Sequence, residues 1–367
     1  MGLRVRLRPA PLIAYHNISQ TMNLRLTTLS ADRFQDYLTF VSQIYPQRGH
    51  VAQRFATQVL QNPFLADADH PEILLALDDD AIIGHFGLNP YPFHWRNQRF
   101  VGHSGFDFYV LEAYRQHGVG KMLAAAAVEQ HPYLGIGATP VAERIYIKLG
   151  AATIGRMYRY LWLRGPAPTL FLAGQALLKN KWPRQPHTIG DFAQLPDQIE
   201  AAGAKFHLRT QADGSEDYAW NADTLTFTRS SQFLDWRYFQ HPRHYRLYAR
   251  TDASPTQFFV LRRETWRGLS LLCMVDYRIP QQRAHDFPIL LQAAQQLTRR
   301  GKFDGLVVYS SLRTIDAALQ RQKFRKIGQP TIVVFKDSHA PDANRIAQRE
   351  AVFATLADCD QDFAVFD

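Results

Sequence analysis

A glycine-containing segment in the first third of the chain carries the residues best suited to bind a phosphate. The run Arg115-Gln116-His117-Gly118-Val119-Gly120-Lys121 follows an apolar stretch and precedes a helical one. Glycines let the backbone turn tightly and bring successive N–H groups to a ligand, and the free amides at a helix N-terminus attract an anion. The segment is therefore a candidate pyrophosphate-binding loop, with a plain strand-to-helix turn as the alternative.

The periodicity of apolar residues predicts a meander of strands before this loop and a β-α-β unit after it. Strands are expected at 24–29, 72–77, 81–88, 91–95 and 100–111, with helices at 31–44 and 51–60. The pattern after the loop predicts a helix at 118–130, a strand at 133–138, a helix at 141–149 and a strand at 152–163. Because the loop follows a meander and does not open the chain, a Rossmann dinucleotide site is disfavoured.

In this context the loop resembles motif A of the GNAT acyltransferase superfamily, whose signature is Val-x-Pro-x-Tyr-Arg-x-x-Gly-x-Gly or Ala. The matching residues are Val110, Tyr114, Arg115, Gly118 and Gly120, and Glu112 replaces the usual proline. The resemblance implies that the loop binds the pyrophosphate of acetyl-coenzyme A or coenzyme A. It assigns cofactor contacts to Val110, Leu111, Arg115, Gln116, His117, Gly118, Val119, Gly120 and Lys121.

A second segment, Ala142–Ala151, resembles the family pattern Ala-x-x-x-Tyr-x-Lys-x-Gly-Phe. Its tyrosine is Tyr146, while Thr139 and Ala151 replace the family's asparagine and phenylalanine. The resemblance implies that Tyr146 acts as a general acid toward the leaving thiolate. A phenol with an ordinary pKa near 10 suits that role. The alternative is a tyrosine that packs one face of a helix.

Acyl transfer from a thioester to an amine needs a neutral amine, a polarised carbonyl and a proton for the sulfur. None of these steps requires a metal, so no metal site is expected. For the base, Asp107 is the preferred candidate and His103 the second, because the two-residue spacing places both on one face of a strand. His85 and Glu112 are further candidates, and deprotonation through water is the alternative.

The length of the chain predicts two domains. A proline-rich break at 166–168 and a basic stretch at 179–186 predict an acyl-CoA-binding domain at 1–165, a linker at 166–195 and a second domain at 196–367. Strands near 245–249, 257–262, 269–277, 306–309 and 331–335, with helices at 284–299 and 314–321, repeat the order of the first half. The fold class is therefore predicted as α+β, with two tandem GNAT-like domains, each a central, mostly antiparallel sheet flanked by helices.

The second domain has Ile279-Pro280-Gln281-Gln282-Arg283 where the first has its glycine loop, so it is not expected to bind coenzyme A. The segment Asp235-Trp236-Arg237-Tyr238 could stack on a base or sugar and hold a phosphate, or could be a packing corner. This segment and the tandem layout resemble, more distantly, acyltransferase-like proteins encoded with bacterial polysaccharide enzymes and Fem-type aminoacyl transferases. That resemblance implies an amino-sugar or sugar-nucleotide acceptor.

The composition is that of a folded protein, with 46% hydrophobic and 20% charged residues. The net charge of +9 favours anionic partners, but the basic residues are scattered, which disfavours specific nucleic-acid binding. The run 170–178 is too short to span a bilayer, and no secretory signal is evident, so a cytoplasmic location is expected. The mixture of apolar and basic residues at 170–182 leaves peripheral membrane contact open, with an interdomain helix as the alternative.

The sequence therefore predicts an acyl-CoA-dependent N-acyltransferase, with acetyl as the default donor, acting on a small or sugar-linked primary amine. One alternative is a tRNA-dependent, Fem-like aminoacyl transferase, which suits the charge but leaves Arg115-x-x-Gly118-x-Gly120 without a role. The other is a non-enzymatic acyl-CoA sensor or scaffold. Acyl chain length, acceptor identity and oligomeric state do not follow from the sequence.

Overall fold

The structure, a computed structural model, describes residues 22–130, 132–178, 190–241, 244–250, 252–336 and 351–359. The elements of the first half are, in chain order, β1 (Leu24–Thr28), η1 (Ala31–Arg33), α1 (Phe34–Ile44), α2 (Val51–Phe55), η2 (Ala56–Leu60), β2 (Ile73–Asp78), β3 (Ala81–Trp95), β4 (Gln98–Val110), η3 (Glu112–His117), α3 (Val119–Gln130), β5 (Tyr133–Ile136), α4 (Pro140–Lys148) and β6 (Ala152–Leu163). The predicted order of elements is confirmed. The strands expected at 81–88 and 91–95 form one long strand, β3.

The elements that follow are α5 (Pro166–Leu178), β7 (Gln198–Ala201), β8 (Ala204–Arg209), β9 (Leu225–Phe227), α6 (Ser231–Leu234), η5 (Asp235–Phe239), β10 (Arg246–Arg250), β11 (Phe258–Trp266), β12 (Leu269–Arg278), η6 (Gln281–Asp286), α7 (Phe287–Arg300), β13 (Gly305–Ser310), α8 (Arg313–Arg321), β14 (Arg325–Lys336), β15 (Val352–Phe353) and η8 (Leu356–Asp358). The predicted linker thus begins with a helix, α5. Its basic stretch at 179–186 and the chain's first 21 residues lie outside the described residues.

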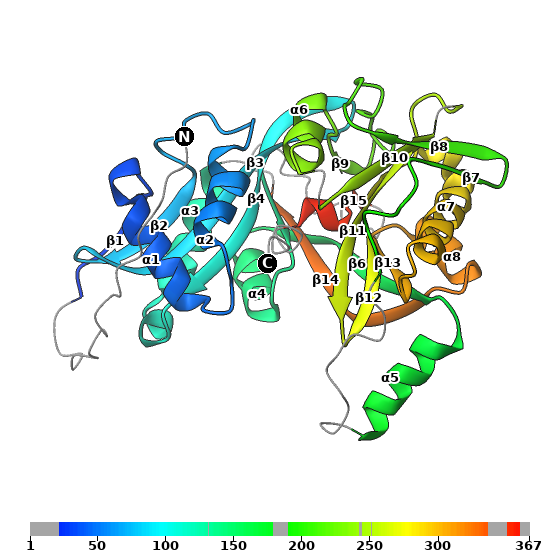
Figure 1. The fold of residues 1–367 in the computed structure, drawn as a ribbon. Coiled ribbons are helices and arrows are strands. Elements are labelled where there is room, and N and C mark those ends of the chain that lie inside the picture. The colour runs from blue at the N-terminus through cyan, green and yellow to red at the C-terminus, as the bar shows by residue number, and fades with distance from the viewer. Residues whose placement is uncertain are drawn as a thin grey trace, which may run out of the picture.

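The two halves share one continuous, mostly antiparallel sheet with helices on its faces, which confirms the α+β class (Figure 1). The main strand order is β1-β2-β3-β4-β5-β14-β6-β13-β12-β11-β10-β8-β7. β14 of the second half pairs with β5, and β6 of the first half pairs with β13. Each half therefore contributes its last long strand to the sheet of the other. The boundaries at 165 and 195 stay a prediction.

Alternating apolar residues on β2 show why helices cover both faces of the first half. Leu74 and Ala76 belong to the core formed with α3, whereas Leu75 and Leu77 pack in the core formed with α1 and α2. Successive strand residues point to opposite faces, so a continuous apolar run requires cover on both sides. Figure 1 shows α1 and α2 on the near face of this part of the sheet.

In the second half, α7 and α8 pack with β12 and β13 in a separate buried cluster. No helix among the described residues is long and apolar enough to cross a membrane.

Candidate active site between two diverging strands

β4 and β5 diverge after a short region of pairing, and a cavity lies between them. The two strands are parallel and pair through His103 with Tyr133 and through Ser104 with Leu134. Beyond these pairs they enclose a cavity of about 770 Å³. Its lining comes from α1 and the following loop, β3, β4, the glycine loop, β5 and α4: Tyr45, Arg48, Phe86, Gly105, Phe106, Asp107, Phe108, Tyr109, Val110, Arg115, Gly120, Tyr133, Gly135, Ile136, Gly137, Ala138, Thr139, Val141, Ala142, Ile145 and Tyr146.

A bulge in β4 lies at the middle of this cavity. His85 of β3 pairs with Tyr109, whereas Gly87 pairs with Phe106, so β4 carries one extra residue at Asp107–Phe108. Asp107 adopts a left-handed conformation with φ of 49°. Aspartate tolerates this region better than most residues, and a bulge redirects the side chains and backbone groups around it. The bulge turns β4 away from the regular ladder at the position where it faces the cavity.

The predicted phosphate-binding loop lies at one end of the cavity. Gly118 has φ of 77°, a left-handed conformation that favours glycine, and it ends η3 immediately before α3 begins. Gly120 lines the cavity, and a Cβ atom there would lie 3.6 Å from Phe108. The first amides of an α-helix have no partner within the helix, so the N-terminus of α3 offers N–H groups to an anion.

Among the predicted cofactor-binding residues, Val110, Arg115 and Gly120 line the cavity. Arg115 Nε donates to the Val110 carbonyl oxygen over 3.1 Å, and its guanidinium lies 5.4 Å from the Tyr109 ring centre. The remaining predicted residues belong to the same loop or the first turn of α3 without lining the cavity: Leu111, Gln116, His117, Gly118, Val119 and Lys121. The structure thus places a cation and a helix N-terminus at the same cavity end.

Tyr146 of α4 also lines the cavity. Thr139 caps this helix by accepting a hydrogen bond from the Ala142 amide over 3.2 Å, and Pro140 occupies its first turn. Tyr146 is buried, with its ring 5.2 Å from that of Tyr133. Burial raises the pKa of Tyr146 well above its ordinary value, outweighing the opposite effect of its hydrogen bond with Tyr133. The phenol therefore keeps its proton, as an acid toward a thiolate requires.

Asp107 lines the cavity as an ion-paired carboxylate. Arg48 Nη1 lies 2.7 Å from both of its oxygens, and Arg54 Nη2 lies 3.7 Å from one of them. The Arg48 guanidinium also stacks over the Tyr45 ring, 3.6 Å from its centre. The sequence had not indicated Arg48 or Tyr45 as site residues, because α2, η2, β2 and β3 separate them from β4 in the sequence. Both carboxylate oxygens of Asp107 therefore face a cation.

The two histidine candidates lie elsewhere. His103 does not line the cavity and forms an ion pair with Glu72 at the start of β2. His85 is fully buried beneath α1, with Nδ1 3.1 Å from the Tyr37 hydroxyl. Burial lowers the pKa of His85 to about 4. Glu112 is exposed at the start of η3. The structure therefore brings Asp107 and Tyr146 to one cavity and leaves both histidines outside its lining.

Aromatic side chains limit the closed end of the cavity, where β4 and β5 join. A Cβ atom on Gly105 would lie 2.5 Å from the Tyr133 hydroxyl and 2.8 Å from the Phe86 ring. A Cβ atom on Gly135 would lie 2.8 Å from the same hydroxyl. These two strand glycines are therefore required by the close approach of Tyr133. Isolated glycines within predicted strands were the signal that could have located this end of the site.

Comparison with known proteins agrees with this geometry. Residues 36–141 match the profile of the acetyltransferase (GNAT) family, a range that contains the diverging strands and the glycine loop. Residues 36–141 are thus similar to a GNAT acetyltransferase domain. No curated protein sequence matches the chain.

Solved structures extend the similarity to most of the chain. A GCN5-related N-acetyltransferase from Anabaena variabilis is 14% identical with a TM-score of 0.57, over 86% of this chain and 72% of that one. A GCN5-related N-acetyltransferase from Kribbella flavida has the same identity and a TM-score of 0.55, over 86% and 71%. The N-myristoyltransferase of Saccharomyces cerevisiae, solved with bound myristoyl-CoA and inhibitors, is 10% identical with a TM-score of 0.54, over 94% and 87%. At these identities the likeness is one of fold.

In the second half, the position that corresponds to the GNAT cavity holds the chain's own segment 351–359. Ser311, just after β13, donates to the carbonyl oxygens of Val352 and Ala354 and accepts from the Ala354 amide over 2.9 Å. The Phe353 ring lies 5.4 Å from that of Tyr277, near the end of β12. The sequence predicted that the second half lacks a glycine loop here. The space between the ends of β12 and β13 is filled by this packed segment.

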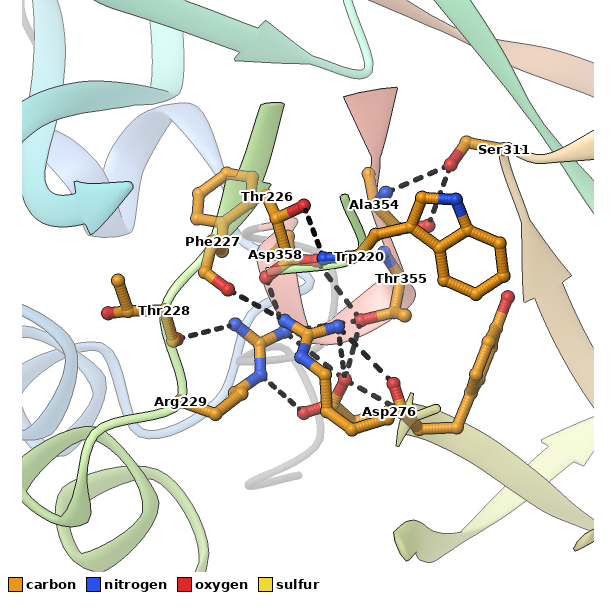
Figure 2. Close-up of polar contacts among 12 residues, drawn as sticks. Trp220, Thr226, Phe227, Thr228, Arg229, Asp276, Ser311, Ala354, Thr355 and Asp358 are labelled. Atoms are coloured by element: carbon orange, nitrogen blue, oxygen red, sulfur yellow. Dashed lines mark hydrogen bonds and ion pairs between the residues drawn. The ribbon is translucent and has the colours of Figure 1, made fainter. Parts of the chain in front are cut away.

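Buried charges hold this segment in place (Figure 2). Arg229 donates to Asp276 over 2.6 Å and to Asp358 over 2.5 Å, and all three side chains are fully buried. Thr355 donates to Asp276 over 3.0 Å, and Arg278 donates to the Phe227 carbonyl oxygen over 2.9 Å. Burial alone would raise the pKa of Asp276, but Arg229 and Arg278 outweigh it and lower that pKa.

The aromatic and cationic segment Asp235–Tyr238 contributes to the same core. Trp236 is buried and donates from Nε1 to the Thr57 carbonyl oxygen over 2.7 Å. Tyr238 is buried and donates to Asp276 over 2.9 Å, and Arg237 is 1% exposed. These side chains form a packing corner between the halves and are not available to stack on a ligand from solvent.

Proposed function

We propose that the chain is an acyl-coenzyme A-dependent N-acyltransferase that binds its thioester substrate between β4 and β5. One observation carries the proposal: a single cavity extends from the N-terminus of α3, at Gly120, along the bulged part of β4 to a closed end at Gly105. An anion-binding helix terminus at one end and a slot between two diverging strands fit a long, thin substrate that carries phosphates at one end.

In this proposal the glycine loop binds the pyrophosphate of coenzyme A through the amides of Arg115 to Lys121. The pantetheine arm follows β4, and the thioester lies near the bulge at Asp107. The amine nitrogen attacks the thioester carbonyl carbon, the carbon–sulfur bond breaks, and the Tyr146 hydroxyl gives its proton to the sulfur. The place of Tyr146 in the cavity lining supports this role, and burial keeps the phenol protonated while making it a weaker acid.

The base stays the least constrained part of the proposal. Asp107 remains the first candidate because it lines the cavity, and its proton transfer would be coupled to loosening of the Arg48 pair. His103 lies outside the lining, so a role in catalysis would have to act through other groups. Water that carries the amine proton away is the third route.

We propose acetyl as the preferred acyl group because aromatic rings lie at the end of the cavity beside Gly105. The rings of Phe86 and Tyr133 occupy the space beyond Gly105, where a longer chain would have to extend. The predicted acceptor, a small or sugar-linked primary amine, would enter from the side of Arg48 and Tyr45, which line the cavity.

The test is calorimetric titration of the full chain with acetyl-CoA, comparing wild type with Gly120→Trp. An indole at residue 120 would enter the cavity beside Phe108, and we expect affinity to fall by at least about a hundred-fold, since the pantetheine path is blocked. Gln282→Trp, an exposed residue after β12, is the matched control and should bind like wild type. Failure of folded wild type to bind acetyl-CoA would overturn the proposal.

Release of free thiol with a panel of amines, including amino-sugar nucleotides, then separates an enzyme from an acyl-CoA sensor. In the same assay Phe86→Ala should improve the use of butyryl-CoA relative to acetyl-CoA, because it enlarges the closed end. An unchanged preference would overturn the assignment of Phe86 as a limit on acyl length.

A further inference from the structure

One end of the shared sheet gathers cationic side chains. β6 ends beside the beginning of β13, through Leu163 paired with Gly305, and beside the beginning of β14, through Leu161 paired with Arg325. The turn between β11 and β12 lies at the same end of the sheet, because β12 begins there. The C-terminus of α7 leads into β13 and that of α8 into β14, and both strands also begin at this end. Residues far apart in the sequence thus share one edge of the molecule.

We call this the basic edge. Its exposed Lys and Arg residues are Arg263, Arg267, Arg299, Arg300, Lys302, Arg321, Lys323, Arg325 and Lys326. The acidic residues within the same segments are Glu264, paired with Arg159, and Asp304, which is buried and accepts from the Ser270 amide. Neither acid neutralises the exposed cations, so this edge attracts anions over a distance comparable to the Debye length, about 8 Å at physiological salt.

Helix α5 projects from the body of the protein at this edge (Figure 1). One side of it packs on the turn between β11 and β12: the Phe171 ring lies against Gly268, and Gln175 donates to the Arg267 carbonyl oxygen over 3.0 Å. Its sequence, PAPTLFLAGQALL, contains no charged residue.

Leu170 and Leu177 of α5 do not face the protein. Leu170 is 69% exposed and Leu177 is 82% exposed. With the exposed Ala173 they follow the i, i+3, i+7 spacing that places residues on one helix face. The structure therefore presents an apolar helical stripe to solvent beside a cationic edge.

Two tryptophans lie beside cations of the basic edge. The Arg299 guanidinium is 5.0 Å from the Trp162 ring centre, and that of Arg267 is 4.9 Å from the Trp266 ring centre. Tryptophan beside arginine is the arrangement enriched at the boundary between lipid headgroups and acyl chains. A duplex or an acidic protein would engage the cations, but neither accounts for two exposed leucines on one face of an uncharged helix.

We propose that α5 and the basic edge form a peripheral docking surface for an anionic phospholipid bilayer. Leu170 and Leu177 enter the acyl-chain boundary, and the cations of the basic edge contact the lipid phosphates. Apolar burial and electrostatic attraction together give stable but reversible attachment. Such docking would hold the enzyme at the membrane surface and favour acceptors carried there, an extension that does not depend on the proposed acyltransferase activity.

Co-sedimentation of the full chain with vesicles tests the proposal. Wild type should bind vesicles of phosphatidylcholine with phosphatidylglycerol at least about ten-fold more strongly than phosphatidylcholine alone, and added salt should weaken the binding. Leu170→Glu with Leu177→Glu should reduce binding at least about ten-fold, since it removes the inserting groups. Val101→Glu, at an exposed apolar residue of β4, is the matched control and should bind like wild type.

Neutralising the edge with Arg300→Gln, Arg321→Gln and Arg325→Gln should remove the preference for the anionic vesicles. The proposal is overturned if wild type does not bind these vesicles, or if the leucine variant binds as well as wild type. It is equally overturned if ultracentrifugation shows that the leucines hold two copies of the chain together, with no vesicle binding. Binding to duplex DNA that ignores the leucine change would assign the edge to nucleic acid instead.

Discussion

The clefts of the two halves are built on the same strand arrangement and are used in opposite ways. Between β4 and β5 of the GNAT domain the space is open, and it ends at a glycine loop. Between the ends of β12 and β13 the chain's own segment 351–359 is packed, and Gln281 and Gln282 occupy the position of the loop. One architecture can therefore supply either a substrate slot or a core, depending on what fills the split.

The two clefts also differ in what their buried charged groups do. The second cleft buries ionised groups and neutralises them in pairs, as Arg229 does with Asp276 and Asp358. The first cleft holds one ion-paired carboxylate, Asp107 with Arg48 and Arg54, and a phenol, Tyr146, that burial keeps uncharged. The ion pairs of the first cleft leave its cavity open, whereas those of the second cleft hold a segment of the chain in place.

Breaking the ion network should therefore affect stability most. Arg229→Met leaves Asp276 and Asp358 buried without their main partner, and the free energy of unfolding should fall by about 3–5 kcal/mol. Arg48→Met in the first half is the matched comparison. Its partner Asp107 retains Arg54 at 3.7 Å, so the cost should be smaller. Urea unfolding of both variants measures the difference.

Equal losses of unfolding free energy in the two variants would mean that the buried ion pairs of the two halves contribute equally to stability. A sharper form of the comparison adds Asp276→Leu to Arg229→Met. Removing Asp276 as well should recover part of the lost stability, because it eliminates one of the two buried carboxylates that Arg229→Met leaves unpaired.

The sequence predicted the elements that line the open cleft but not the exchange of strands that joins the halves. Apolar periodicity located β4, α3 and α4 because each buries a face with a regular spacing. β6 and β14 were predicted as strands, yet periodicity carries no information on the neighbouring strand, and either sheet could have received them. The strands β7, β8, β9 and β15 were missed, and β7, β9 and β15 contain too few residues to show a period.

The site was predicted to a similar extent. The glycine loop and Tyr146 follow from local spacing, and the structure brings both to one cavity. Arg48 and Tyr45 reach Asp107 only through tertiary packing, which no local pattern encodes. Segment 235–238 was one candidate for a ligand-stacking site because of its aromatic and cationic residues. These side chains are buried against partners far away in the sequence, such as Thr57, which no local pattern reveals.

The buried histidine of the first half should give that half a distinct sensitivity to acid. Because the folded state disfavours protonated His85, the unfolded chain binds one more proton, and stability is complete above about pH 6.5 and falls as the pH drops toward about 4. The loss due to His85 is about 3 kcal/mol over that range. The lowered pKa of Asp276 contributes its loss only below about pH 4, where unfolded aspartate protonates.

His85→Phe should remove the loss between about pH 6.5 and about pH 4, and leave the loss at lower pH in place. Unfolding by urea at a series of pH values gives both slopes. His70→Gln, at an exposed histidine paired with Asp67, should follow the wild-type curve. A His85→Phe curve parallel to wild type across the whole range would show that this side chain does not control the acid response.

The smallest expected effect is also the most specific to the open cleft. If Tyr146 donates the proton to the leaving thiolate, Tyr146→Phe keeps the ring packing against Tyr133 and removes only the hydroxyl, so kcat should fall by about a hundred-fold while the affinity for acetyl-CoA stays unchanged. Tyr309→Phe, on β13 of the second half, should leave both quantities unchanged.

A loss of affinity without a loss of kcat would assign Tyr146 to the wall of the slot. A rate that recovers with a thioester whose thiolate needs no proton would identify the missing proton as the cause, because packing defects do not respond to the leaving group.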